Sequence, residues 1–350
     1  MSATRSIVVV FVSLFAAATA HAGAPPSPGP WALSVVGGIN LAESAFSDNW
    51  AGGDKGNINW VLNADLGAKR QLSSKVNWSN QLQLAFGQTS TQRSDAASPS
   101  RKSWSTPDKT TDLILFESVG RFTLGAFVDP YLSFRLDSQF LDESDPIGRI
   151  ALNPIKLTET AGAARVLHCG DADSAGCKEE WIVRTGFGFR QSIARSFADS
   201  TGRKNNFTTN DGGVELQSTA KFPLADKRVL YDAKLLVFLP VFYSRSDALT
   251  EFDRIARAAD PAREAVADFW KVPDVNFQNT FTSQITSWLN VNLYAQWVYD
   301  KFDAATNVVV EGAAGDPAVL EKLTHVVDAG TRKAGQFKQT LGIGLTYKFL

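Results

Sequence analysis

A strict alternation of side chains recurs along this chain and limits its fold more than any other feature. In "LGIGLTYKFL", Leu341, Ile343 and Leu345 alternate with glycine or threonine. This period of two is that of a β-strand with one apolar face and one small or polar face. The pattern predicts an all-β protein with about 12 strands. The expected strands lie near residues 31–41, 56–70, 75–89, 110–122, 128–141, 154–166, 181–192, 210–222, 229–242, 275–285, 289–300 and 336–349.

The connections between these strands alternate between short turns and long loops. Short turns include "QLSS", "TLGA", "PLADKR" and "TSW". The long connections are 42–55, 90–109, 142–153, 193–209, 243–274 and 301–335. The connection that contains both cysteines is the exception, because it is longer than the other turns on its side. This plan predicts a transmembrane antiparallel up-and-down β-barrel with partly helical long extracellular loops and both termini in the periplasm.

A secreted soluble β-sandwich is the alternative fold, because its strands also alternate. A sandwich does not need short and long connections in succession, and most of these segments reach the roughly 9–11 residues that a tilted membrane strand requires. Aromatic residues also fall beside the short turns, as in the girdle of a membrane barrel. They are Trp31, Trp181, Trp288, Phe122, Phe222 and Phe349. The sequence therefore favours the barrel.

The N-terminus has the pattern of a secretory signal. Arg5 precedes an apolar run, and Ala20-His21-Ala22 gives the small-x-small pattern of a cleavage site. We expect residues 1–22 to be a cleaved signal peptide, 23–30 a short linker and 31–350 the barrel. The expected location is the outer membrane, with outer-membrane lipid and the barrel-insertion machinery as partners.

Two cysteines, Cys169 and Cys177, lie in the turn-rich stretch "HCGDADSAGC". In an exported protein this spacing predicts a disulfide that closes a small loop. A metal site with His168 is the alternative, but the spacing typical of zinc sites is missing. We therefore expect no metal. The formal net charge of −1 gives no indication of a nucleic-acid partner.

An enzymatic role is not expected. After the signal peptide only His168 and His325 remain, and both fall in connections. An acyl hydrolase would need a positioned imidazole. His325 instead lies in a stretch with helical spacing, which Asp316 would cap and Gly330 would end. No catalytic residue or cofactor is predicted.

Charged side chains on the polar faces of the expected strands are the candidate functional residues. They are Arg135, Asp137, Lys156, Arg184, Arg190, Glu215, Lys221, Asp232 and Lys234. Two interpretations stay open: the charges pair and fill the barrel, or they line a water-filled passage. A barrel of about 12 strands lies between filled 8-strand and open 16-strand barrels, so its size does not decide between them.

The long connection at 243–274 has apolar residues at helical spacing. The stretch "SDALTEFDRIARAADPAREAVADFWK" predicts two short amphipathic helices broken at Pro261. The first would bury Leu249 and Phe252, and the second Val266 and Phe269. We expect these helices to form a cap against the barrel rim or over its mouth.

Several stretches resemble the domain of unknown function 3078 family of exported bacterial proteins. They are "FSDNWAGGDKGNINW", "VNWSNQLQLAFG", "WVYDKFD" and "GQFKQTLGIGLTYKFL". The resemblance implies an outer-membrane barrel and implies no activity. The spacing of Gly344, Tyr347 and Phe349 also resembles the C-terminal signal that such barrels present to the insertion machinery, although Leu350 follows the last aromatic residue here.

The combined expectation is an outer-membrane channel or uptake pore for small solutes. A structural or surface-binding barrel with a charge-plugged lumen is the alternative. The sequence names no solute and does not indicate an oligomeric state.

Overall fold

The structure is a computed structural model that describes residues 28–44, 56–95, 98–170, 172–173, 176–177, 180–198, 200–310 and 316–348. The expected signal peptide, residues 1–22, and Phe349 lie outside these residues. Within the described ranges, no helix is long and apolar enough to cross a membrane.

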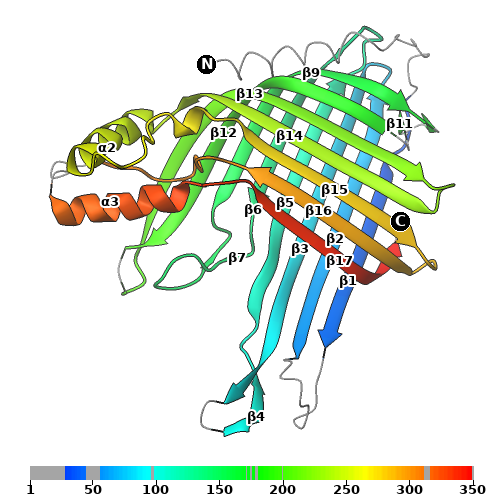
Figure 1. Ribbon diagram of the computed structural model, residues 1–350. Coiled ribbons are helices and arrows are strands. Elements are labelled where there is room, and N and C mark those ends of the chain that lie inside the picture. The colour runs from blue at the N-terminus through cyan, green and yellow to red at the C-terminus, as the bar shows by residue number, and fades with distance from the viewer. Residues whose placement is uncertain are drawn as a thin grey trace.

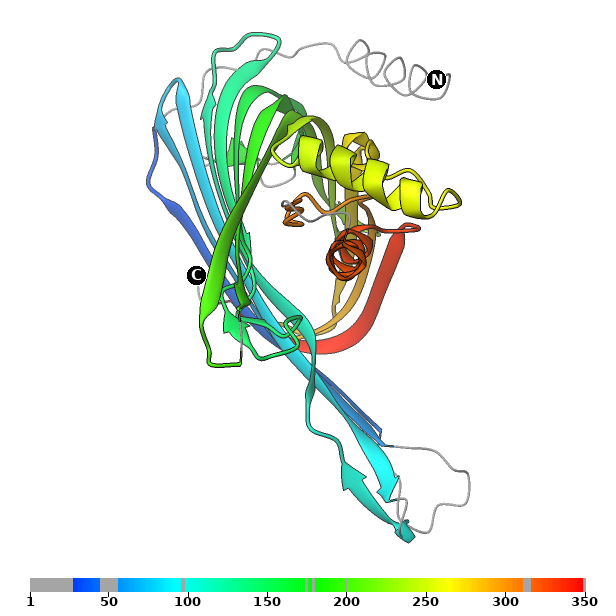
Figure 2. The ribbon, with the colours of Figure 1, turned by 90° about the vertical axis from the view of Figure 1, so that its left-hand side faces the viewer.

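Twelve antiparallel strands close into one barrel (Figures 1 and 2). They are β1 (Ala32–Ser44), β2 (Asn57–Ser73), β3 (Val76–Asp95), β5 (Asp108–Phe122), β6 (Asp129–Ser138), β9 (Ile155–Cys169), β12 (Glu180–Phe197), β13 (Lys204–Leu224), β14 (Val229–Tyr243), β15 (Asp274–Gln284), β16 (Leu289–Tyr299) and β17 (Gln336–Lys348). Each strand pairs with the next in this order, and β17 pairs with β1 through Gly38 and Thr346, which closes the ring. The predicted fold class is confirmed.

The outer surface of the barrel is apolar. Phe187 on β12 stands opposite Val214 on β13, and their exposed fractions are 50% and 45%. Leu132 on β6 and Leu341 on β17 are exposed in the same way. Water would make such a surface unfavourable, whereas lipid tails match it. A closed ring leaves no unpaired strand edge, so its backbone groups are satisfied inside the hydrocarbon region. The barrel is therefore transmembrane.

An extension and two small hairpins lie outside the ring. β4 (Ser98–Trp104) pairs with the C-terminal end of β3. Together with the adjoining ends of β2 and β3, it forms an arm that reaches away from the helices (Figure 2). The hairpins are β7 (Leu141–Asp142) with β8 (Ile150–Ala151), and β10 (Ala172–Asp173) with β11 (Gly176–Cys177).

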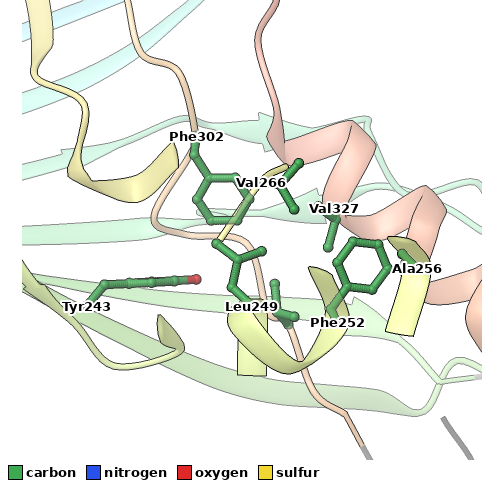
Figure 3. Packing of buried hydrophobic residues seen from close by; sticks show 8 residues of the cluster. Tyr243, Leu249, Phe252, Ala256, Val266, Phe302 and Val327 are labelled. Atoms are coloured by element: carbon green, nitrogen blue, oxygen red, sulfur yellow. The ribbon is translucent and has the colours of Figure 1, made fainter. Parts of the chain in front are cut away.

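Two long loops pack together at one end of the barrel. The loop between β14 and β15 contains α2 (Ser246–Ala259) and the 3-10 turn η1 (Phe269–Lys271), and the loop between β16 and β17 contains α3 (Pro317–Gly330). We call the described residues of 244–273 and 300–335 the loop cap. Its apolar core joins both loops to the end of β14 (Figure 3). The core residues are Tyr243, Leu249, Phe252, Ala256, Val266, Phe302, Val308 and Val327.

Two of the three helices predicted in these loops are present, namely α2 and α3. α3 begins after Asp316, whose carboxylate accepts from the backbone N–H groups of Ala318 and Val319, and it ends at Gly330, as expected. The helix predicted after Pro261 is wrong, because that segment forms turns and η1. The backbone N–H of Val266 donates to the carboxylate of Asp253 at 2.7 Å, which replaces the helical hydrogen bond.

Candidate functional site in the barrel lumen

The strand register places all nine predicted lumen residues on the inward face. Leu132 is exposed on the outside of β6, so the odd-numbered Arg135 and Asp137 point into the barrel. On β12 and β13 the same reasoning places Arg184 and Glu215 inside, where their exposed fractions are 7% and 2%. The remaining inward residues are Lys156, Arg190, Lys221, Asp232 and Lys234.

Ion pairs between distant strands show that these charges meet inside the ring. Glu117 on β5 accepts from Arg184 on β12 at 2.6 Å and lies 3.6 Å from Lys234 on β14. Four strands, β6, β9, β12 and β13, separate β5 from β14 along the sheet. Only a contact that crosses the lumen can join such strands. Glu117 therefore links opposite walls of the barrel.

A second group of pairs lies nearer the loop cap. Arg135 donates to Glu215 at 3.2 Å, and the hydroxyl of Thr160 also donates to Glu215 at 3.2 Å. Arg190 donates to the carboxylate of Asp211 and, at 2.8 Å, to that of Asp274. We call these residues, together with the Glu117 pairs, the charge network. It occupies the half of the lumen between β5 and β15 and compensates the buried charges there.

The end of the barrel opposite the cap has its own bridge. Lys69 on β2 donates to Glu180 on β12 at 3.3 Å, although four strands of the sheet separate them. Arg121 on β5 lies 3.9 Å from the same carboxylate. The side chains of Lys69 and Glu180 keep exposed fractions of 26% and 22%, so water reaches this bridge.

The other half of the lumen is lined by amides. Its side-chain hydrogen bonds join the same or neighbouring strands, such as Gln296 to Asn276 at 2.9 Å and Asn292 to Asn290 at 2.6 Å. The inward-facing Lys338 and Thr340 on β17 are exposed. We call the inward faces of β16, β17 and β1 the amide wall. It carries polar groups that water can reach, without the bridges of the charge network.

The loop cap is tied to the lumen by one ion pair. Lys156 on β9 donates to Asp303 of the cap at 3.2 Å. Burial acts to raise the pKa of the Asp303 carboxyl, but the ammonium of Lys156, the backbone N–H of Ala305 and the charge of Arg332 together outweigh it, so this pKa is lowered. Asp303 and Ala304 line a cavity of about 130 Å³ together with residues of the charge network. The cap therefore covers part of the barrel mouth.

The other predicted residues lie away from this network. Lys221 stands opposite Asp232 between β13 and β14, towards their short connecting turn. Cys169 is disulfide-bonded, and the side chain of Cys177 lies outside the described ones. Gly344 and Tyr347 lie on β17. The prediction that both histidines lie in connections is wrong for His168, which lies near the end of β9 and packs its ring 5.6 Å from that of Phe222. His325 is exposed on α3 of the loop cap.

Several network residues escaped the sequence reasoning. Glu117 could have been found, because it alternates with the outward Phe116 and Ser118 on a predicted strand. Asp274 is the first residue of β15, and Asp211 lies at the start of the predicted segment 210–222, although β13 begins earlier, at Lys204. Alternation gives little evidence at the end of a predicted segment. Asp303 lies in a loop, and no sequence pattern places a loop carboxylate against a barrel strand.

Comparisons with solved structures return membrane barrels at low similarity. A COG4313 outer membrane channel from Pseudomonas putida F1 is 14% identical, with a TM-score of 0.40, and the match covers 93% of this chain and 97% of that one. The β domain of the Bordetella autotransporter BrkA is 12% identical, with a TM-score of 0.26 and coverages of 92% and 99%. OprB of Pseudomonas putida is 10% identical, with a TM-score of 0.22 and coverages of 91% and 92%.

No curated protein matches this chain. A family model does match it, over residues 41–143, and that family is described as "Protein of unknown function (DUF3078)". The matched segment runs from the end of β1 to the start of the loop after β7, and it contains Glu117, Arg135 and Asp137. The resemblance seen in the sequence is confirmed over residues 41–143, which contain two of the four stretches named above, and strands β2, β3, β5 and β6 of this segment belong to the closed β-barrel.

Proposed function

We propose that this outer-membrane barrel conducts small polar solutes along the amide wall of its lumen. The observation that carries the proposal is the unequal division of the lumen. The charge network bridges one half, while the inward-facing Lys338 and Thr340 of the other half are exposed to solvent. Neutral amides can replace the hydration of a polar solute without holding it tightly, which suits passage.

The charge network has a supporting role in this proposal. Bridges such as Glu117 to Lys234 brace opposite walls and narrow the barrel. Because most of its charges are paired, the network exerts only a weak field on passing ions. The charges with the greatest influence on selectivity are then the exposed ones, above all Lys338.

Single-channel conductance of the purified protein in a planar bilayer tests the proposal, with the reversal potential measured across a salt gradient. We expect steady conductance steps, and a shift towards cation selectivity in Lys338→Glu. Gln339→Glu is the matched control, because its neighbouring position faces outwards and is also exposed. Equal selectivity in both variants would place the ion path elsewhere.

A plugged structural barrel is the second candidate, and the bridge between Glu117 and Lys234 is the observation that favours it. A silent bilayer would support it, provided that heat-modifiable gel mobility shows a folded barrel. In either case we propose export through a cleaved signal peptide at residues 1–22 and insertion through the C-terminal signal. N-terminal sequencing of the mature protein tests cleavage, with Gly23 as the expected first residue.

A further inference from the structure

A cavity lies where the loop cap meets the barrel wall. Its volume is about 130 Å³, and its lining comes from β6, β9, β12, β13, β15 and the start of the loop after β16. Five aspartates and three basic residues line it, which gives a formal charge of −2. The cavity therefore favours a cation over an anion.

The ion pairs around the cavity leave one carboxylate without a cation. Lys156 pairs with Asp303, and Arg190 pairs with Asp211 and Asp274. Among the residues that the structure describes, Asp300 has no basic group within ion-pair distance, and it accepts the backbone N–H of Phe302 at 3.0 Å. Burial, together with the charge of Asp303, raises the pKa of Asp300, and one oxygen of its carboxyl is also hydrogen-bonded to the carboxyl of Asp274. Asp300 thus keeps acceptor capacity for a ligand.

Ser192 provides an independent observation at the same cavity. Its side chain is only 9% exposed, and its hydroxyl oxygen has no hydrogen-bond partner within the described part of the chain. Ser192 lines the cavity from β12. A buried hydroxyl without a partner is unfavourable, so a ligand that hydrogen-bonds to it gains affinity.

We propose that this cavity binds the ammonium group of a small polar amine. Such amines would then be one class of solute for the channel proposed above, on which this part of the inference rests. An ammonium group has three N–H donors. The Asp300 carboxylate and the Ser192 oxygen accept two of them, and the carboxylate compensates the charge. Within the described residues, no group of three or more carboxylates, histidines or cysteines is arranged to hold a metal ion.

Isothermal titration calorimetry of the detergent-folded barrel with ethylammonium chloride tests the site. Tetramethylammonium chloride has the same charge without N–H donors, and it should bind at least tenfold more weakly. Asp300→Asn should weaken ethylammonium binding about tenfold or more, since it removes a charge-assisted hydrogen bond. Asp232→Asn is the matched control, because it removes an inward carboxylate away from the cavity, and it should leave binding unchanged.

Ser192→Ala keeps the test decisive if Asp300→Asn does not fold. Since the hydroxyl has no partner among the described residues, its removal should leave the fold intact and weaken ethylammonium binding several-fold. Equal binding in wild type and Ser192→Ala, or equal binding of the two cations, would overturn the site. Binding without bilayer conductance would refute the channel and retain the site. Conductance without binding would refute the site and retain the channel.

Discussion

Lys156 and Asp303 are 147 residues apart in the chain, and their side chains form an ion pair at 3.2 Å. Lys156 belongs to β9 and Asp303 to the loop that follows β16. The pair therefore joins a barrel strand to the loop cap, and it does so beside the cavity proposed as an amine site.

Lys156→Met should loosen the loop cap without weakening the barrel. The two side chains are 43% and 30% exposed, so the pair contributes no more than about 1 kcal/mol. We expect faster amide hydrogen exchange in residues 300–310 and an unchanged midpoint of barrel unfolding. Lys227→Met in the exposed turn between β13 and β14 is the control. Equal exchange in both variants would show that the pair does not hold the cap.

Acid should release the same contact. Burial opposes ionisation of Asp303, but the ammonium of Lys156, the backbone N–H of Ala305 and the charge of Arg332 together outweigh it, so the pKa of Asp303 is lowered in the folded protein. Its contribution is therefore complete above the ordinary carboxyl pKa of about 4 and is lost as the pH falls through the lower folded pKa. Hydrogen exchange of residues 300–310, corrected for intrinsic rates, should rise in this range. Lys156→Met should reduce that pH dependence, since the Ala305 N–H and Arg332 still act on Asp303. A dependence of unchanged size would assign it to other groups.

Arg190→Gln should destabilise the barrel strongly. It leaves the carboxylates of Asp211 and Asp274 without their common cation, and Asp211 is only 5% exposed. Removing one partner of a buried pair costs about 3–5 kcal/mol, and partial exposure of Arg190 and Asp274 reduces this to roughly 2–4 kcal/mol. Denaturant unfolding in detergent measures the loss. Arg254→Gln breaks the exposed pair with Glu251 on α2 and should leave the unfolding midpoint unchanged, because water screens that pair.

Gly162→Ala should impair the packing of β9 against β12. A Cβ at this position would lie 2.0 Å from the carbonyl oxygen of Thr185, and backbone cannot move aside as a flexible side chain can. Overpacking of this kind costs about 1–3 kcal/mol. Gly120→Ala on β5 is the matched control, since a Cβ there meets nothing within 4 Å. If both variants unfold at the same denaturant concentration, the backbones of β9 and β12 do not approach each other so closely at Gly162.

Two neighbouring valines on α3 test the core of the cap. Val327 is fully buried against α2, whereas Val326 is 40% exposed. Val327→Ala should lower the free energy of opening the loop cap by about 1–3 kcal/mol, because it removes buried methyl groups. Val326→Ala should change that free energy by no more than about 0.5 kcal/mol. Limited proteolysis of the folded barrel measures the opening of the cap. Similar cleavage rates for the two variants would contradict the packing of α3 on α2.

The sequence by itself determined the number of strands, their order and the direction of their side chains. A period of two needs no knowledge of distant contacts, so segments such as 229–242 were predicted within a residue of β14. The start of α3 after Asp316 was predictable for a similar reason, because the Asp316 carboxylate accepts from backbone N–H groups only two and three residues further along the chain. The second loop helix failed because a side chain from α2, Asp253, takes the backbone N–H of Val266.

Only the tertiary structure decided which inward charges meet. Glu117 and Lys234 are each placed on the inward face by their own strands, but the contact between them depends on how the ring closes. The relative stagger of all strands sets which residues face each other across the lumen. A shift of one strand by two residues would keep its side chains on their faces and change the bridges that this strand makes. The division into a charge network and an amide wall is therefore a property of the closed barrel.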